Sequence, residues 1–129
     1  MNTVFVYGTL KRGFRNHHLL HDSEYLGEAT TAQRYTMTVA DGTPFVNRDA
    51  KLTPIHGEVY WVTADTFDKL DELEEHPVWY KREEVDVHLH RENGQTLLLT
   101  AWIYLKAQEG IVVSTGTFTK EEERLERSQ

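Results

Sequence analysis

The chain has 129 residues and no cysteine, so we expect one domain over residues 1–129 without disulfides or thiolate chemistry. Its 21 acidic side chains outnumber its 14 basic ones, and the resulting formal charge of −7 repels phosphate groups and anionic headgroups. We therefore expect neither nucleic acid nor a membrane as a partner.

The N-terminal segment predicts a short buried strand over residues 3–7, because it is β-branched and aromatic and ends at Gly8. It lacks the basic region and the long apolar stretch of a secretion signal, and no segment has the roughly 20 apolar residues needed to cross a bilayer. These features favour a cytoplasmic protein. Further along, Asn16 is a candidate N-cap for a short helix that extends to His21.

The next part of the chain has the composition of strands joined by turns. Residues 24–30 and 34–39 are predicted to form two strands separated by polar residues, and a third strand is expected from about residue 55 to 62. Between them, residues 40–44 form a turn cluster, because Asp and Gly accept the dihedral angles of a turn and Pro presets φ.

A helix is predicted over residues 63–75. Thr63 can cap it, Asp65 suits the positive end of the helix dipole, and Pro77 stops it. At 100° per residue, Glu74 lies about 20° from Phe67 on the helical wheel, inside the apolar stripe, so its carboxylate is predicted to face the interior. Desolvation would raise its pKa and make it a proton acceptor and donor near neutral pH.

The position of Glu74 in the last helical turn also allows a structural interpretation. Its side chain could instead turn out to solvent or pair with Arg82.

The last predicted elements are a hairpin and a charged tail. Residues 82–90 alternate between apolar and polar side chains, Asn93 and Gly94 favour a tight turn, and residues 97–105 form the returning strand. A short charged helix can begin at Thr119, within a charged tail over about residues 117–129. Hairpins with one embedded helix predict an α+β fold with a small, strongly curved or barrel-like mixed sheet. The pattern does not decide whether that sheet closes.

The loop that follows the first strand, residues 7–13, contains two glycines around a strand end. Bare backbone N–H groups there can receive a carboxylate or an oxyanion. The nucleotide-binding P-loop is excluded, because Phe14 and Arg15 stand where Lys and Ser or Thr are needed. A plain tight turn is the alternative.

Other candidate side chains have structural explanations. His17, His18 and His21 have helical spacings that can hold a metal, but no further ligands are visible and surface histidines are common. The tryptophans lie on or beside predicted strands, so core packing is expected for Trp61, Trp79 and Trp102.

Four stretches in this order resemble the γ-glutamylcyclotransferase-like superfamily, and most closely its γ-glutamylamine cyclotransferases. They are Val6–Gly13 followed by Asn16 and His17, Gly42–Phe45, Gly57–Tyr60, and Leu70–Glu74 with Tyr80 and Arg82 downstream. The resemblance extends from Val4 to about Leu105.

This resemblance implies a small mixed β-barrel with flanking short helices. It also implies a cyclisation that needs no metal and no cofactor and converts a γ-glutamyl group to 5-oxoproline with release of an amine. The family's catalytic glutamate matches Glu74. Its substrate pocket corresponds here to Tyr7, Gly8, Thr9, Leu10, Tyr80 and Tyr104. Glu75 stands where many relatives have a small residue, so its charge is expected to raise the pKa of Glu74 further or to alter the pocket entrance.

We favour a monomeric enzyme that acts on a small γ-glutamyl substrate. Two alternatives to this enzyme remain open. A domain of the same fold can bind a small carboxylate metabolite without turnover. A role in partner interaction through the acidic segment 120–127 is the other, although charged C-termini are usually solvated. The released amine is not indicated by the sequence.

Overall fold

The structure is a computed structural model that describes residues 1–124. Its elements in chain order are β1 (Asn2–Val6), the 3-10 helix η1 (His17–Leu20), β2 (Glu24–Ala40), β3 (Thr43–Asn47), β4 (Thr53–Val62), α1 (Ala64–Leu73), β5 (Lys81–His90), β6 (Thr96–Leu105), β7 (Ile111–Val112) and α2 (Lys120–Arg124). The last residues of the predicted charged tail, 125–129, lie outside the described residues.

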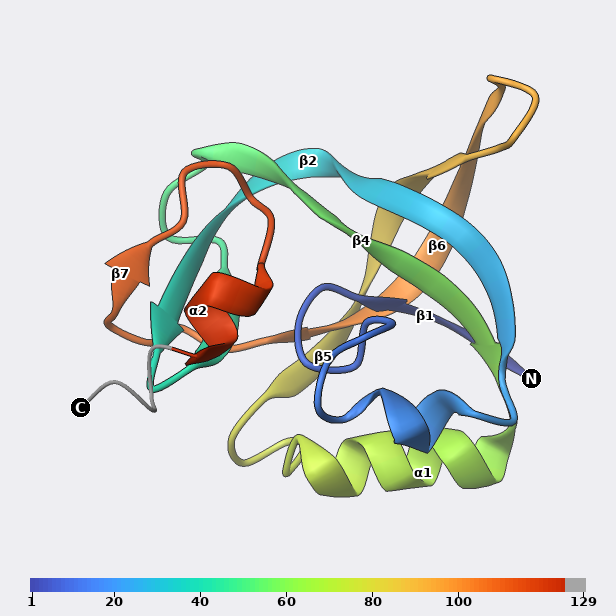
Figure 1. The fold of residues 1–129 in the computed structure, drawn as a ribbon, viewed down its shortest axis with the longest axis horizontal. Helices are drawn as coiled ribbons and strands as arrows, with labels where there is room; N and C mark the ends of the chain where they lie inside the picture. Colours follow the sequence, from blue (N-terminus) through green and yellow to red (C-terminus); the bar gives the residue numbers. More distant parts are fainter. Residues whose placement is uncertain (125–129) are drawn as a thin grey trace.

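The sheet closes into a mixed barrel, which confirms the expected fold class. Its strands follow the order β2, β4, β1, β6, β5, and β5 pairs back with β2, where Ala29 lies opposite Leu89. The β1–β6 pair is parallel and the other pairs are antiparallel. Figure 1 shows the strands curving around a common interior.

A single 17-residue strand, β2, replaces the two strands predicted for this region. Its register with β4 shifts twice, once around Gly27 and once between Thr30 and Arg34. Irregularities of this kind bend a strand without ending it. The polar residues that suggested a break therefore mark the bend at which β2 leaves the barrel.

Beyond this bend, β2 forms a hairpin with β3. Asp41 and Gly42 have φ angles of 51° and 71°, as required at both central positions of a type I′ turn. The prediction that Thr43 and Pro44 belong to the turn was wrong. The turn needs only two residues, and Pro44 lies in β3, where it pairs with Val39 of β2.

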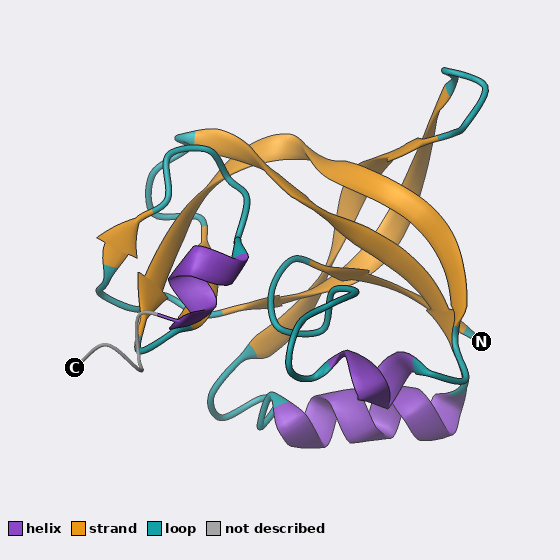
Figure 2. Cartoon of the chain, in the orientation of Figure 1, coloured by secondary structure: helices purple, strands orange, loops and turns teal. Residues whose placement is uncertain are grey.

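Apolar side chains form two clusters, one inside the barrel and one between its outer face and the helices. Successive side chains of β1 point to opposite faces, so this strand contributes to both clusters: Phe5 belongs to the first, and Val4 and Val6 belong to the second. Figure 2 shows α1 and η1 side by side along one side of the barrel. The expected core packing was wrong for Trp61 and Trp79, which are 43% and 45% exposed.

Helix α1 begins as predicted. Thr63 Oγ1 accepts a hydrogen bond from the N–H of Thr66 at 3.2 Å, and Phe67 and Leu70 are buried. The helix ends at Leu73, earlier than predicted, with Glu74 as its C-cap.

The predicted cap of η1 was wrong, because Asn16 makes no side-chain cap bond and its Nδ2 instead donates to Thr9 Oγ1 at 2.9 Å.

The β5–β6 hairpin extends beyond the barrel, as Figure 1 shows. The predicted turn at Asn93 and Gly94 is confirmed, with Gly94 at a φ of 83°. Since this end of the hairpin has no covering layer, Leu97 and Leu98 are 49% and 59% exposed.

None of the helices in the described part of the chain is long and apolar enough to span a membrane.

Candidate active site

A cavity of about 210 Å³ lies where the loop after β1 meets the C-terminal end of α1. It brings together every residue that the sequence placed in the site, namely Tyr7, Gly8, Thr9, Leu10, Glu74, Tyr80 and Tyr104. These residues come from four separate parts of the chain: the loop after β1, the end of α1, the start of β5 and the end of β6. The barrel therefore assembles the cavity from segments that are distant in the sequence.

Glu74 is held at the cavity by backbone hydrogen bonds on both sides. Its N–H donates to Leu70 O at 2.9 Å, and its carbonyl accepts from the N–H of Tyr80 at 3.0 Å. Burial raises the pKa of Glu74 from 4.5 to about 7. Among residues 1–124 its carboxylate makes no ion pair. This carboxyl group can therefore take up and release a proton near neutral pH.

Arg82 was the alternative partner for Glu74, and the structure assigns it to Asp71 instead. Arg82 Nε donates to Asp71 Oδ1 at 2.8 Å and to Oδ2 at 3.1 Å, and its guanidinium lies over the rings of Phe67 and Trp102. Burial by itself would raise the pKa of Asp71, but hydrogen bonds from Arg82 and Tyr104 outweigh it and lower that pKa. Asp71 neutralises the arginine and leaves Glu74 unpaired in the cavity.

Three tyrosines wall the cavity, and each hydroxyl already donates a hydrogen bond. Tyr7 donates to Tyr104 O at 2.7 Å, Tyr80 donates to Pro44 O at 2.8 Å, and Tyr104 donates to Asp71 Oδ1 at 2.6 Å. Burial raises the pKa of all three hydroxyls above their usual value, so they remain protonated. Their rings are therefore fixed, and their oxygens can still accept hydrogen bonds from a ligand.

The loop after β1 lines the cavity with Gly8, Thr9 and Leu10. The N–H groups of Gly8, Thr9 and Leu10 donate to no acceptor within residues 1–124. A side chain at Gly8 would not fit, because its Cβ would lie 2.4 Å from Pro44 Cγ. Glycine therefore allows the loop to approach β3 closely enough to form the cavity wall.

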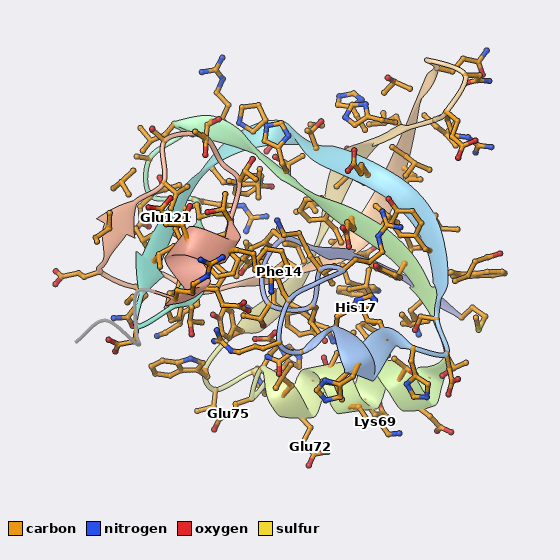
Figure 3. All side chains as sticks on the ribbon, viewed as in Figure 1. Phe14, His17, Lys69, Glu72, Glu75 and Glu121 are labelled. Carbon is orange, nitrogen blue, oxygen red and sulfur yellow. The ribbon has the colours of Figure 1, made fainter. Side chains whose placement is uncertain are left out.

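Glu75 is an exposed residue that lines the cavity, and it lies at the end of α1 (Figure 3). It adopts a φ of 52°, in the left-handed region that favours glycine, which explains why a small residue suits this position. Burial alone accounts for the raised pKa of Glu74, so the expected contribution of the Glu75 charge to that pKa is not supported. Glu72, one turn from Glu75, points away from the barrel into solvent (Figure 3).

Sequence reasoning missed several lining residues, among them Arg15, Pro44 and Trp79. The stretch Gly42–Phe45 belonged to the family resemblance and could have indicated Pro44. Arg15 and Trp79 carried no comparable signal, because their places at the cavity depend on contacts between distant segments.

The histidine cluster does not form a metal site. In the described residues no group of three or more His, Cys, Asp or Glu side chains is arranged to hold a metal ion. His17 has a structural contact instead, because its Nδ1 lies 2.9 Å from Leu10 O and its ring packs against Tyr60.

The sequence model of the family described as gamma-glutamyl cyclotransferase, AIG2-like, matches residues 4–125. The chain belongs to this family. A Methanocaldococcus jannaschii protein that is provisionally named a gamma-glutamylcyclotransferase is 38% identical over 120 residues, covering 92% of this chain and 96% of that protein. Gamma-glutamylaminecyclotransferase A of Danio rerio is 35% identical over 123 residues, covering 89% of this chain and 70% of that protein.

The family fold agrees with that of a solved structure. The crystal structure of an AIG2-like protein from Mus musculus superposes with a TM-score of 0.81 at 23% identity and covers 94% of this chain and 90% of that one. Family membership and the named relatives make the chain a gamma-glutamylcyclotransferase-like enzyme.

Proposed function

We propose that this enzyme cyclises the γ-glutamyl group of a small γ-glutamyl amine or peptide to 5-oxoproline and releases the amine, with Glu74 as the general base and acid. One observation carries the proposal. Within residues 1–124 Glu74 makes no ion pair, and burial raises its pKa to about 7, while Asp71 pairs with Arg82. A carboxylate with this pKa suits proton transfer at neutral pH.

The proposed substrate pose follows from the groups that line the cavity. The unoccupied N–H groups of Gly8, Thr9 and Leu10 would receive the α-carboxylate or the oxyanion that develops on the γ-carbonyl oxygen. The α-ammonium group would face Glu74, and the tyrosine oxygens could accept its remaining hydrogen bonds. Holding the chain in this folded conformation brings the amine close to its own carbonyl carbon.

The proposed reaction begins when Glu74 takes a proton from the α-ammonium group, which is unreactive while protonated. The freed amine attacks the γ-carbonyl carbon and a five-membered ring closes, with negative charge on the carbonyl oxygen. Protonated Glu74 then donates its proton to the leaving nitrogen, and the bond between carbon and that nitrogen breaks. Glu74 removes the extra proton from the ring nitrogen and passes it to the released amine, which restores the carboxylate.

The test is to incubate the purified protein with γ-glutamyl-ε-lysine, γ-glutamyl dipeptides and glutathione and to measure 5-oxoproline by mass spectrometry. We expect Glu74→Gln to lower kcat by about 10²- to 10⁴-fold, the usual contribution of a general base. Glu72→Gln is the matched control, because Glu72 lies on the same helix but is exposed outside the cavity. A Glu74→Gln variant with the activity of the control would overturn the assignment.

A further inference from the structure

The cavity has a closed end and an open end that differ in exposure and charge. Buried side chains line the closed end, among them Tyr7, Leu10 and Tyr104. Exposed side chains also line the cavity and mark its open end, among them Arg15, Glu75 and Trp79. Among the lining residues within the described range 1–124, Arg15 is the only one with a basic side chain.

Arg15 is fixed at the open end by three neighbours. Its Nη1 donates to Gly42 O at 3.0 Å, its Nη2 donates to Thr43 Oγ1 at 3.0 Å, and its backbone N–H donates to Glu123 Oε2 at 3.1 Å. The same Glu123 oxygen lies 3.7 Å from Nη1, while the Arg15 side chain remains 36% exposed. An arginine side chain has five N–H donors, so its hydrogen bonds to the β2–β3 hairpin leave other donors available for a ligand.

A second positive charge lies close to this end of the cavity. Lys106 Nζ lies 4.5 Å from the centre of the Trp79 ring, which is itself part of the cavity wall. The acidic groups near the entrance are Glu75, and Glu123 beside Arg15. The chain as a whole has a net charge of −7 and repels anions. A guanidinium held at the cavity entrance favours an anionic group at that place.

We propose that Arg15 binds a carboxylate on the amine that is released, and so selects γ-glutamyl substrates whose leaving group is an amino acid or another carboxylate-bearing amine. This inference rests on the proposed function, in which the γ-glutamyl group occupies the closed end beside Glu74 and the leaving group extends to the open end. Guanidinium is well suited to this contact, because it forms short, charge-assisted hydrogen bonds with carboxylates.

The test compares γ-glutamyl-alanine with γ-glutamyl-alaninamide, two substrates that differ in the carboxylate of the leaving group. We expect the wild-type protein to have a kcat/KM at least about tenfold higher for the carboxylate, which corresponds to about 1.4 kcal/mol. Arg15→Gln should lose this preference, and Arg15→Lys should retain part of it. Arg34→Gln, which removes the same charge at an exposed position outside the cavity, should keep the full preference.

Two results would overturn the inference. One is a wild-type protein that turns over both substrates equally. The other is an Arg15→Gln variant that loses the same factor on both substrates, because that would assign Arg15 to the γ-glutamyl part or to the architecture of the loop. If the wild-type protein forms no 5-oxoproline from these two substrates or from γ-glutamyl-ε-lysine, the γ-glutamyl dipeptides and glutathione, the proposed function itself is refuted, and the inference with it.

Discussion

Replacing Glu74 by glutamine is expected to stabilise the protein at pH 8 while it lowers kcat. The pKa of Glu74 rises from 4.5 to about 7 because the carboxylate loses solvent on folding. The folded state therefore binds a proton more tightly than the unfolded state, and the free energy of unfolding decreases as the pH rises through this interval. At about 1.4 kcal/mol for each pH unit, ionised Glu74 costs the folded protein up to about 3 kcal/mol above pH 7.

Glutamine fills the same space without this ionisation. Urea unfolding of the wild type and of Glu74→Gln at pH 4 and pH 8 should show a stability difference that favours the variant by about 3 kcal/mol more at pH 8. In thermal unfolding the corresponding change in Tm is roughly 10 °C for a domain of this size. Glu72→Gln, which is exposed on the same helix, is the control variant. An equal difference at both pH values would mean that Glu74 ionises normally, and the reasoning about the base would fail.

Further predictions concern the base, its neighbours and the helix cap. The kcat/KM of the wild type should rise about tenfold from pH 6 to pH 8, because the ionised fraction of a base with a pKa of about 7 rises from about one tenth to about nine tenths; a flat profile would indicate another base. Asp71→Asn should cost about 1–3 kcal/mol at pH 7 by urea unfolding, because it leaves Arg82 without its carboxylate. Since the pKa of Asp71 is lowered in the fold, this loss should shrink as the pH falls below 3.8, and a loss that is constant with pH would argue against the ion pair. Gly8→Ala should destabilise by about 1–3 kcal/mol and raise KM, because its Cβ would lie 2.4 Å from Pro44, and unchanged kinetics would contradict the tight loop. Thr63→Ala should cost about 1 kcal/mol of stability through loss of the N-cap and leave kcat unchanged, so a change in kcat would mean that the cap also affects the site.

Some interactions between near neighbours in the chain were predictable, whereas the cap expected from Asn16 was not formed. The Thr63 cap and the turn at Asn93 and Gly94 depend on residues within a few positions of each other, and the structure contains both. The alternation of buried residues in β5 also follows the sequence pattern. Helical periodicity likewise directed Glu74 toward the apolar side of α1, where the cavity lies.

Interactions between distant segments were not predictable from those patterns. The polar interruption in β2 is equally compatible with a loop and with a bend, and only pairing along β4 distinguishes them. Trp61 and Trp79 were expected in the core because they lie on or beside strands, but the alternation of a strand does not reveal which face another layer covers. Whether a face is buried depends on packing partners from elsewhere in the chain.

The sequence by itself indicated the cap of α1, the β5–β6 turn and a curved mixed sheet, and the family motifs indicated several of the residues that line the cavity. Only the tertiary structure decided that β5 pairs with β2 to close the barrel, that Arg82 pairs with Asp71 and leaves Glu74 unpaired, and that Arg15 stands at the cavity entrance. The physical reason is the range of the interactions. Capping and periodicity act within a few residues, whereas desolvation and ion pairing depend on groups that only the closed barrel brings together.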